Sequence, residues 1–231
     1  MVIKGLQKLT LLDFPEKIAA TVFTGGCNFR CPFCHNASLV VPEKFADTIP
    51  ESQITEFLRS RVGRLGGVCI SGGEPTLQPD LAAFIRRVRD MGFAVKLDTN
   101  GYRPEVLGHL LSEGLLDYVA MDVKNSKAGY AAAVGIPGFD ISPIEQSLAI
   151  LRESGVPYEL RTTVVKGLHT EREIEEMGEW IAGAERVFLQ TFTDSGDLIG
   201  TGLSAPSADK LAACLAAVQP YVPSATLRGS K

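Results

Sequence analysis

The 231-residue sequence has neither an excess of basic charge nor a long apolar run, and each absence argues against a class of protein. The net charge is −4, so no overall positive field favours nucleic-acid binding. No stretch approaches the roughly 18 uninterrupted apolar residues of a membrane span. The start of the chain lacks the apolar run and the cleavage site of a signal peptide. We therefore expect a cytoplasmic protein that binds neither nucleic acid nor membrane.

Cysteine is also scarce, with five residues, and three of them lie within residues 27–34. Without an export signal, this usage indicates reduced thiols rather than disulfides. Cys69 falls in a strand-like segment and Cys214 in a helix-like one, so we expect both to be small buried apolar side chains. The chain has no second group of cysteines that could bind a relay cluster.

The clustered cysteines have the spacing C-x3-C-x2-C, from Cys27 through Cys31 to Cys34. Three thiolates on one short loop can hold three corners of a cubane [4Fe-4S] cluster. The fourth iron then has no protein ligand and can bind a substrate, as the open position of a catalytic zinc site does. The spacing therefore predicts chemistry at an iron–sulfur cluster.

Three other interpretations of this loop remain open. A structural zinc ion normally takes four ligands, and His35 would be the fourth in an awkward position beside Cys34. Residues 31–35 also match the C-x-x-C-H pattern of covalent haem attachment, and Cys31 with Cys34 matches a thioredoxin-like redox pair. Both of these leave Cys27 without a role.

Strand-like and helix-like segments alternate along the chain with no break in composition, so we predict one domain over residues 1–231. Strands are expected at 18–23, 68–71, 93–97, 118–123, 158–165 and 186–191. Helices are expected near 51–62, 81–91 and 104–112, and after the capping residues Ser142, Thr170 and Ser207. At Ser142 and Thr170 a glutamate three residues later completes the pattern of a capping box.

Repetition of strand and helix predicts parallel strands joined by right-handed crossovers. Six such units are fewer than the eight of a closed barrel, so the predicted fold class is α/β, an open parallel (β/α)6 three-quarter TIM-like barrel. A flat, doubly wound sheet is the second choice. In either fold the functional site lies at the carboxyl ends of the strands.

Polar residues follow the expected strands at these ends. Gly-Gly-Glu-Pro at 72–75 follows the second strand, and Asp-Thr-Asn-Gly at 98–101 follows the third. The later strands carry Asp122, Lys124, Arg161 and Gln190 at or near their ends. Randomly placed polar residues would be found at both ends of the strands, so this placement supports a single site.

These motifs resemble those of a known family. The cysteine spacing, with Phe33 before the last cysteine, is similar to the signature of radical S-adenosylmethionine enzymes, and residues 71–75 resemble their glycine-rich motif. Residues 34–36, 98–101 and 122–124 resemble the activating enzymes of glycyl radical enzymes. More narrowly, residues 11–15 and 24–27 resemble the activating proteins of anaerobic ribonucleoside-triphosphate reductase. Glu16 departs from this pattern, in which glycine is expected before Lys17.

The resemblance implies that Cys27, Cys31 and Cys34 hold a [4Fe-4S] cluster whose free iron is chelated by S-adenosylmethionine. One electron cleaves the sulfonium, and the resulting 5′-deoxyadenosyl radical takes a hydrogen atom from a glycine of a partner. Cofactor contacts are implied for Phe33, Gly72, Gly73, Glu74, Asp98, Thr99, Asn100, Asp122, Lys124, Arg161 and Gln190. Beyond the cluster and the cofactor, no residue is expected to be catalytic.

The resemblance also implies partners. They are a large glycyl radical enzyme, which we expect to be anaerobic ribonucleotide reductase, and a one-electron donor such as flavodoxin or ferredoxin. Asp98 with Asp122 is expected to hold a monovalent cation. We expect His35 to orient the cysteine loop or meet the partner, and His109 and His169 to lie at the surface.

Two other functions remain open. The first is a radical enzyme that acts on a small molecule, similar to 7-carboxy-7-deazaguanine synthase. Such an enzyme needs a substrate pocket of its own, and the sequence shows no added domain to build one. The second is a binding module without catalysis, which would hold an iron–sulfur cluster or zinc.

Overall fold

The computed structural model describes residues 1–229 as one eight-stranded sheet whose spatial order follows the chain order. The strands are β1 (Ile3–Thr10), β2 (Ala19–Thr24), β3 (Gly67–Gly72), β4 (Ala94–Thr99), β5 (Tyr118–Asp122), β6 (Tyr158–Val164), β7 (Val187–Thr191) and β8 (Thr226–Arg228). β1 pairs antiparallel with β2, and every later pair of neighbours is parallel.

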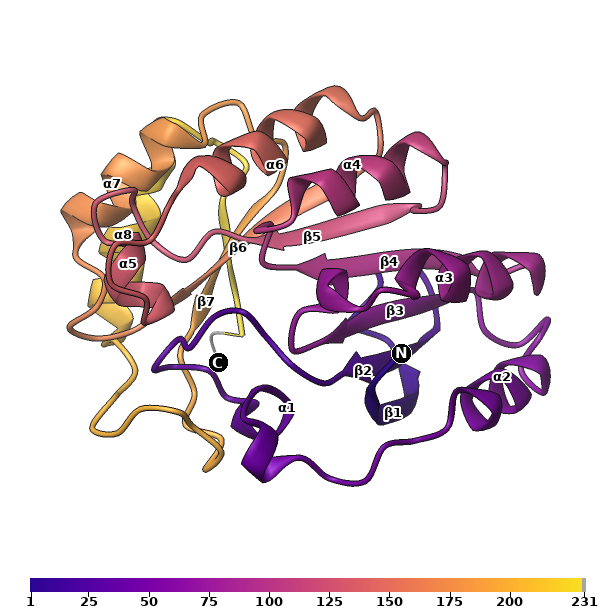
Figure 1. Cartoon of the computed structure of the whole chain (residues 1–231). Helices are drawn as coiled ribbons and strands as arrows, with labels where there is room; N and C mark the ends of the chain where they lie inside the picture. Colours follow the sequence, from indigo (N-terminus) through magenta and orange to yellow (C-terminus); the bar gives the residue numbers. More distant parts are fainter. Residues whose placement is uncertain (230–231) are drawn as a thin grey trace.

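Helices cover the sheet. They are α1 (Ala37–Val40), α2 (Glu51–Arg59), α3 (Leu81–Asp90), α4 (Pro104–Ser112), α5 (Tyr130–Val134), α6 (Ser142–Glu153), α7 (Glu171–Trp180) and α8 (Ala208–Val218), with 3-10 turns η1 (Pro42–Lys44) and η2 (Pro75–Leu77). Figure 1 shows α3, α4 and α6 along one face of the sheet and α1 on the opposite side. Among these helices, which belong to residues 1–229, none has the length and apolar character needed to span a bilayer.

The predicted open, partial barrel is confirmed. The parallel strands β2 to β8 are added one after another in the same direction, and the sheet does not close. In a doubly wound sheet the strand order reverses at a switch point, and no such reversal is present in the described chain. The six predicted strands correspond to β2–β7.

The two outermost strands were not predicted. Burial along β1 does not alternate from one residue to the next. Only Ile3 and Thr10 are buried, residues 4–6 are partly buried, and residues 7–9 are exposed. β8 has only three residues. Pairing with β2 and β7, rather than a local sequence signal, therefore selects the strand conformation at both edges.

Two of the three predicted caps are confirmed. Thr170 forms a complete capping box with Glu173, and Ser207 accepts a hydrogen bond from the Lys210 N–H. The capping box predicted at Ser142 is wrong, because α6 has no side-chain cap. The Ser142 hydroxyl instead donates to the Asp140 carboxylate at 2.7 Å. Asp140 precedes the capping-box pattern of residues 142–145, so the pattern did not reveal this competing acceptor.

The two faces of the sheet differ chemically because side chains alternate along each strand. Val95, Leu97 and Val119 join the main apolar core of the molecule. On the inner face, Lys96 and Glu159 are each only 1% exposed. The interior of the barrel is therefore lined with charged groups, which must be paired or hydrogen-bonded when buried.

The loop between β1 and β2 lies at the amino ends of the parallel strands. Phe14 from this loop forms a second, smaller apolar cluster with Ala19 and Tyr118. A Cβ on Gly67 would lie 2.8 Å from the Phe14 ring, so the start of β3 needs glycine. Phe14 thus covers the end of the barrel opposite to the predicted site.

Candidate active site

A cavity of about 310 Å³ lies at the carboxyl ends of the parallel strands. All fourteen residues predicted as cluster ligands or cofactor contacts line it. They are Cys27, Cys31, Cys34, Phe33, Gly72, Gly73, Glu74, Asp98, Thr99, Asn100, Asp122, Lys124, Arg161 and Gln190. The structure therefore brings these residues together, while the role of each one stays a prediction.

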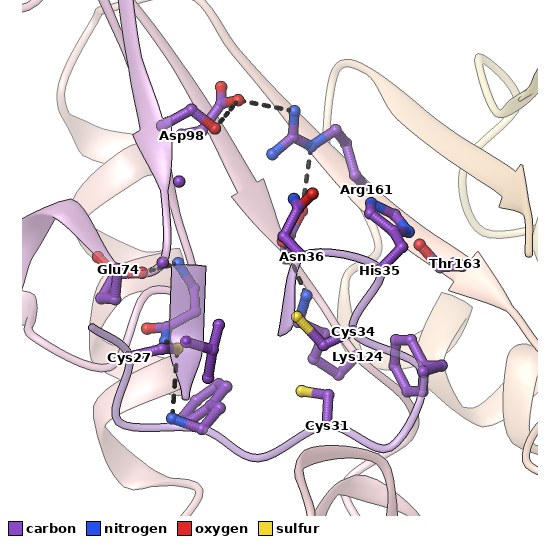
Figure 2. A pocket seen from close by; sticks show the side chains of 18 of the residues that line it. Cys27, Cys31, Cys34, His35, Asn36, Glu74, Asp98, Lys124, Arg161 and Thr163 are labelled. Carbon is purple, nitrogen blue, oxygen red and sulfur yellow. Dashed lines mark hydrogen bonds and ion pairs between the residues drawn. The ribbon is translucent and has the colours of Figure 1, made fainter. Parts of the chain in front are cut away.

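The three clustered thiols belong to the cysteine loop, residues 25–36. Figure 2 shows the sulfur atoms of Cys31 and Cys34 pointing from this loop into the cavity. Burial raises the pKa of the Cys27 thiol to about 12 and that of Cys31 to about 11, and it also raises the pKa of Cys34. The thiols are therefore neutral on their own, and metal binding must displace their protons.

The arrangement of these side chains bears on the kind of metal. Within residues 1–229, no three His, Cys, Asp or Glu side chains are grouped closely enough to hold one metal ion. In a cubane cluster each thiolate binds a different iron, so the sulfur atoms need not converge on one point. A cubane cluster would therefore not require the three thiols to be grouped around one point.

Two glycines let the loop after β3 lie against the cysteine loop. The Gly73 N–H donates to the Thr24 carbonyl at 2.9 Å, and the Glu74 N–H donates to the Gly26 carbonyl at 2.8 Å. A Cβ on Gly73 would be only 2.0 Å from the Gly26 oxygen. Glycine at position 73 is therefore needed for the approach of the two loops.

Residues 195–200, after β7, hold the other end of the cysteine loop. The Gly200 N–H donates to the Pro32 carbonyl at 2.8 Å. The Asp197 carboxylate accepts a hydrogen bond from the Ser38 N–H at 2.8 Å, at the start of α1. The cysteine loop is thus fixed from both sides, by β3 and by the segment that follows β7.

Five charged side chains of alternating sign extend across the inner face of β4, β5 and β6: Lys96, Asp98, Arg161, Asp122 and Lys124. Lys96 pairs with Asp98. The Arg161 guanidinium reaches Asp98 at 3.3 Å, as Figure 2 shows, and it also reaches Asp122 at 3.0 Å. Lys124 pairs with Asp122 at 2.8 Å. Each carboxylate therefore has two cationic partners.

These pairs keep the site ionised. Burial alone would raise the pKa of Asp122, but Lys124 and Arg161 outweigh it and hold that pKa well below its usual range. Burial likewise opposes ionisation of Asp98, and Arg161 and Lys96 lower its pKa. Both carboxylates are charged at neutral pH and available to polar groups of a ligand.

Glu74 lies between two loops of the site and is 1% exposed. One carboxylate oxygen accepts hydrogen bonds from the Thr76 N–H and from the Thr99 hydroxyl at 2.7 Å. The other accepts the Asn100 N–H at 2.6 Å. Glu74 therefore connects the loop after β3 to the loop after β4, and its hydrogen bonds position both.

The prediction that His169 lies at the surface is wrong, since it is 2% exposed. Its Nδ1 accepts the Val165 N–H at 3.1 Å, while Nε2 lies 2.8 Å from the Lys124 carbonyl, to which it donates. Its ring also packs edge-on against Phe33, with centroids 6.0 Å apart. A histidine in a loop just before a helix N-cap is expected to be exposed to solvent. Here the loop folds back onto the ends of β5 and β6, and His169 is buried.

Eight further residues of the cavity wall were not predicted as cluster ligands or cofactor contacts, although His35, Asn36 and Ser71 belong to the motifs named from the sequence. They are Phe29, His35, Asn36, Val40, Ser71, Thr163, Thr191 and Thr193. Strand alternation could have indicated Thr163, two residues after Arg161. The Thr191 hydroxyl oxygen is buried and has no hydrogen-bond partner within the described chain. His109 is exposed, as predicted. His35 is also exposed, and its role in orienting the cysteine loop or meeting the partner stays a prediction.

The fold and this site together define the class of protein. Residues 21–181, more than half of the chain, match the family model described as the radical SAM superfamily. The chain therefore belongs to the radical SAM superfamily and is an enzyme. This family uses a [4Fe-4S] cluster and S-adenosylmethionine.

Within this superfamily, the chain is similar to proteins of two kinds, activating enzymes of glycyl radical enzymes and a cyclase. The chain is 35% identical over 195 residues to a Methanocaldococcus jannaschii protein with the provisional name glycyl-radical enzyme activating enzyme, covering 82% of this chain and 79% of that one. It is 30% identical over 184 residues to the pyruvate formate-lyase-activating enzyme of Clostridium pasteurianum, covering 74% and 71%. A Thermococcus kodakarensis protein provisionally named GTP 3′,8-cyclase is 31% identical over 69% of this chain, which spans only 51% of that protein.

Among solved structures, a radical SAM methyltransferase from Sphaerobacter thermophilus matches with a TM-score of 0.74. The match covers 95% of this chain and 68% of that chain at 16% identity. This likeness concerns the fold alone, and it agrees with the open, partial barrel described above.

The residues of the cavity fit the two groups that the family uses. Three thiols on one loop supply the soft donor set of an iron–sulfur cluster. The charged groups Asp122 and Lys124 suit a zwitterionic ligand, and the unpartnered Thr191 hydroxyl offers a hydrogen bond to a polar one. The donor set and the cavity wall therefore match a cluster with an adjacent polar cofactor.

Proposed function

We propose that this enzyme generates a glycyl radical on a partner protein, and that the partner is an anaerobic ribonucleoside-triphosphate reductase. Similarity to two activating enzymes over most of both chains supports the first part. The resemblance of residues 11–15 and 24–27 to one type of activating protein supports the second. A flavodoxin or ferredoxin is the proposed electron donor, because no other group of cysteines in the sequence could bind a relay cluster.

The single observation that carries the proposal is the convergence of all fourteen predicted residues on one cavity of about 310 Å³. This volume is near the lower end of the range of ligand pockets, about 300–1,000 Å³. The similarity to two activating enzymes favours a protein partner over a separate small molecule as the substrate at this cavity.

In this proposal the cluster and S-adenosylmethionine, when bound, supply the one-electron cleavage and the hydrogen abstraction. Cys27, Cys31 and Cys34 serve as the protein ligands of the cluster. Asp122 and Lys124 provide charges of both signs for the polar groups of the cofactor. Burial in the barrel keeps these groups away from bulk water, which strengthens each electrostatic contact.

The monovalent cation expected at Asp98 and Asp122 stays a prediction. Arg161 lies between these carboxylates and contacts both. A potassium ion there would have to share them with the guanidinium. Its presence would make the affinity for S-adenosylmethionine depend on potassium concentration at constant ionic strength.

We also propose that residues 1–231 form one domain, although the last two residues lie outside the described part. One apolar core contains residues from Ile3 to Ala225, so segments before and after the matched range 21–181 pack with it.

The proposed function is tested by low-temperature EPR of the reduced enzyme with S-adenosylmethionine and an anaerobic ribonucleotide reductase. A glycine-centred doublet is expected, and it should be absent when the radical-bearing glycine of the reductase is changed to alanine. Cleavage of S-adenosylmethionine without this doublet would contradict the proposed partner. That outcome would favour a small-molecule substrate, in line with the similarity of part of this chain to the Thermococcus kodakarensis cyclase.

A further inference from the structure

The hydrogen bonds to the Cys27 sulfur come from two parts of the chain. The Phe29 N–H donates at 3.3 Å, and the Asn100 carboxamide donates through Nδ2 at 3.8 Å. Phe29 belongs to the cysteine loop itself, whereas Asn100 follows β4 and is 73 residues away in sequence. The second donor is therefore brought to the sulfur by the tertiary fold.

Neighbouring groups fix the orientation of the Asn100 carboxamide. Its oxygen accepts the Tyr102 N–H at 3.0 Å, so the NH2 end must face the cysteine loop. That end donates to the Asn28 side-chain oxygen at 2.8 Å as well as to Cys27. The two N–H hydrogens of the carboxamide thus match two acceptors.

The backbone of Asn100 is held as firmly as its side chain. Its N–H donates to the buried Glu74 carboxylate at 2.6 Å, and the residue is 6% exposed. A donor that is fixed before the metal binds loses little entropy when its acceptor becomes charged. Asn100 is therefore pre-oriented toward a thiolate at Cys27.

We infer that Asn100 raises the reduction potential of the cluster by donating a hydrogen bond to the Cys27 thiolate. This inference rests on the proposed binding of a [4Fe-4S] cluster by Cys27, Cys31 and Cys34. Reduction adds one electron to the cluster and its thiolates, so an N–H donor stabilises the reduced state more than the oxidised one. Asn100 lines the cavity, and its contact with the cofactor stays a prediction, while its amide hydrogens face the cysteine loop.

The test is a potentiometric titration of the reconstituted enzyme without S-adenosylmethionine, followed by EPR of the reduced cluster. Asn100→Leu removes the donor and should lower the equilibrium constant for reduction about tenfold, which is a negative shift of about 59 mV for one electron. Asn100→Asp keeps the size of the side chain but replaces the donor with an anion. It should shift the potential in the same direction by at least as much.

Asn28→Ala is the matched control, because it also removes an amide–amide bond of the cysteine loop but leaves the Asn100 donor facing Cys27. Its potential should equal or exceed that of the wild type. Iron and sulfide content must be the same in all samples, which shows that a shift does not arise from partial assembly.

An unchanged potential in a cluster-loaded Asn100 variant would overturn the inference. Loss of the cluster from both Asn100 variants would also overturn it, since Asn100 would then be needed for assembly rather than for setting the potential. Failure of the wild type to assemble a [4Fe-4S] cluster would instead contradict the proposed function. The two failures are thus distinguishable.

Discussion

Glu16 is the only residue other than glycine with a positive φ in residues 1–229, at 62°. This conformation is left-handed, and it costs a residue with a Cβ roughly 1–2 kcal/mol. Glutamate, where the resemblance leads us to expect glycine, therefore adopts the left-handed conformation that glycine favours. The chain keeps the left-handed conformation and bears its energetic cost.

Replacing Glu16 by glycine should therefore raise the free energy of unfolding. We expect a gain of about 0.5–1 kcal/mol, because the greater freedom of glycine in the unfolded chain offsets part of the relief. Urea denaturation at pH 7 measures the change. Glu16→Ala, which keeps the Cβ, is the control and should give no gain. A less stable glycine variant would show that the Glu16 side chain itself stabilises this turn.

Gly73 is a second residue at which a single atom matters. In Gly73→Ala the new Cβ would lie 2.0 Å from the Gly26 carbonyl oxygen, so the loop after β3 must move away from the cysteine loop. We expect the affinity of the cluster-loaded enzyme for S-adenosylmethionine to fall at least tenfold, as measured by calorimetry. In the control Gly66→Ala the Cβ meets nothing closer than 3.7 Å. Equal affinities for both variants would contradict the proposed role of this loop.

At the scale of elements, β8 is attached to the sheet by an ion pair whose carboxylate, Glu159, is buried. The Arg228 guanidinium binds both oxygens of Glu159 on β6, at 2.7 and 3.0 Å, and lies 3.5 Å above the Phe188 ring. The Tyr118 hydroxyl adds a third hydrogen bond to the same carboxylate, at 3.0 Å. A strand of three residues is thus held by its side chain as well as by its backbone.

Arg228→Met should therefore destabilise the protein by about 2–3 kcal/mol at pH 7, because it leaves a buried carboxylate without its cation. We place the loss below that of a fully buried pair, since the Arg228 side chain is 37% exposed. Arg172→Met removes an ion pair whose arginine is 86% exposed, and as a control it should change stability by less than about 0.5 kcal/mol.

The same variant should have a characteristic pH dependence. Burial would raise the pKa of Glu159, but Arg228 outweighs it and lowers that pKa below its usual 4.5. A lowered pKa stabilises the folded state above pH 4.5, and this advantage is lost as pH falls through the folded-state pKa. The stability difference between wild type and Arg228→Met should therefore shrink below pH 4.5 in urea titrations. A difference that stays constant down to pH 3 would mean that the charge of Glu159 is not involved.

For the whole molecule, the sequence allowed the internal strands and the site to be predicted together. Each motif follows a parallel strand, and the carboxyl ends of parallel strands meet at one end of the barrel, so Gly72, Asp98 and Arg161 could be placed in one site. What could not be predicted depends on contacts between distant segments. The burial of His169 and the support of Pro32 by Gly200 are examples, since both are set by how loops fold over the finished barrel.

The polar interior of the barrel is the other feature that strand patterns alone did not reveal. Parallel strands buried on both faces usually have continuous apolar runs. Here Lys96, Asp98 and Glu159 face inward, where Lys96 pairs with Asp98 on the same strand. Arg161 on β6 reaches Asp98, and Arg228 on β8 reaches Glu159, each pair crossing one intervening strand. These ion pairs depend on the strand register, which places Asp98 beside β5 and Asp122 beside Arg161. The register is a property of the folded sheet and not of any single strand. The interior therefore combines structural ion pairs with the charges of the site.

The central claim is that Cys27, Cys31 and Cys34 hold a [4Fe-4S] cluster at which S-adenosylmethionine is cleaved. Its most direct test is the amount of 5′-deoxyadenosine and methionine released by anaerobically reconstituted enzyme with reductant, for the wild type and for Cys31→Ala. We predict equal amounts of both products from the wild type, and loss of both the cluster and the cleavage in the variant. No cleavage by cluster-loaded wild type, or undiminished cleavage by Cys31→Ala, would contradict the account.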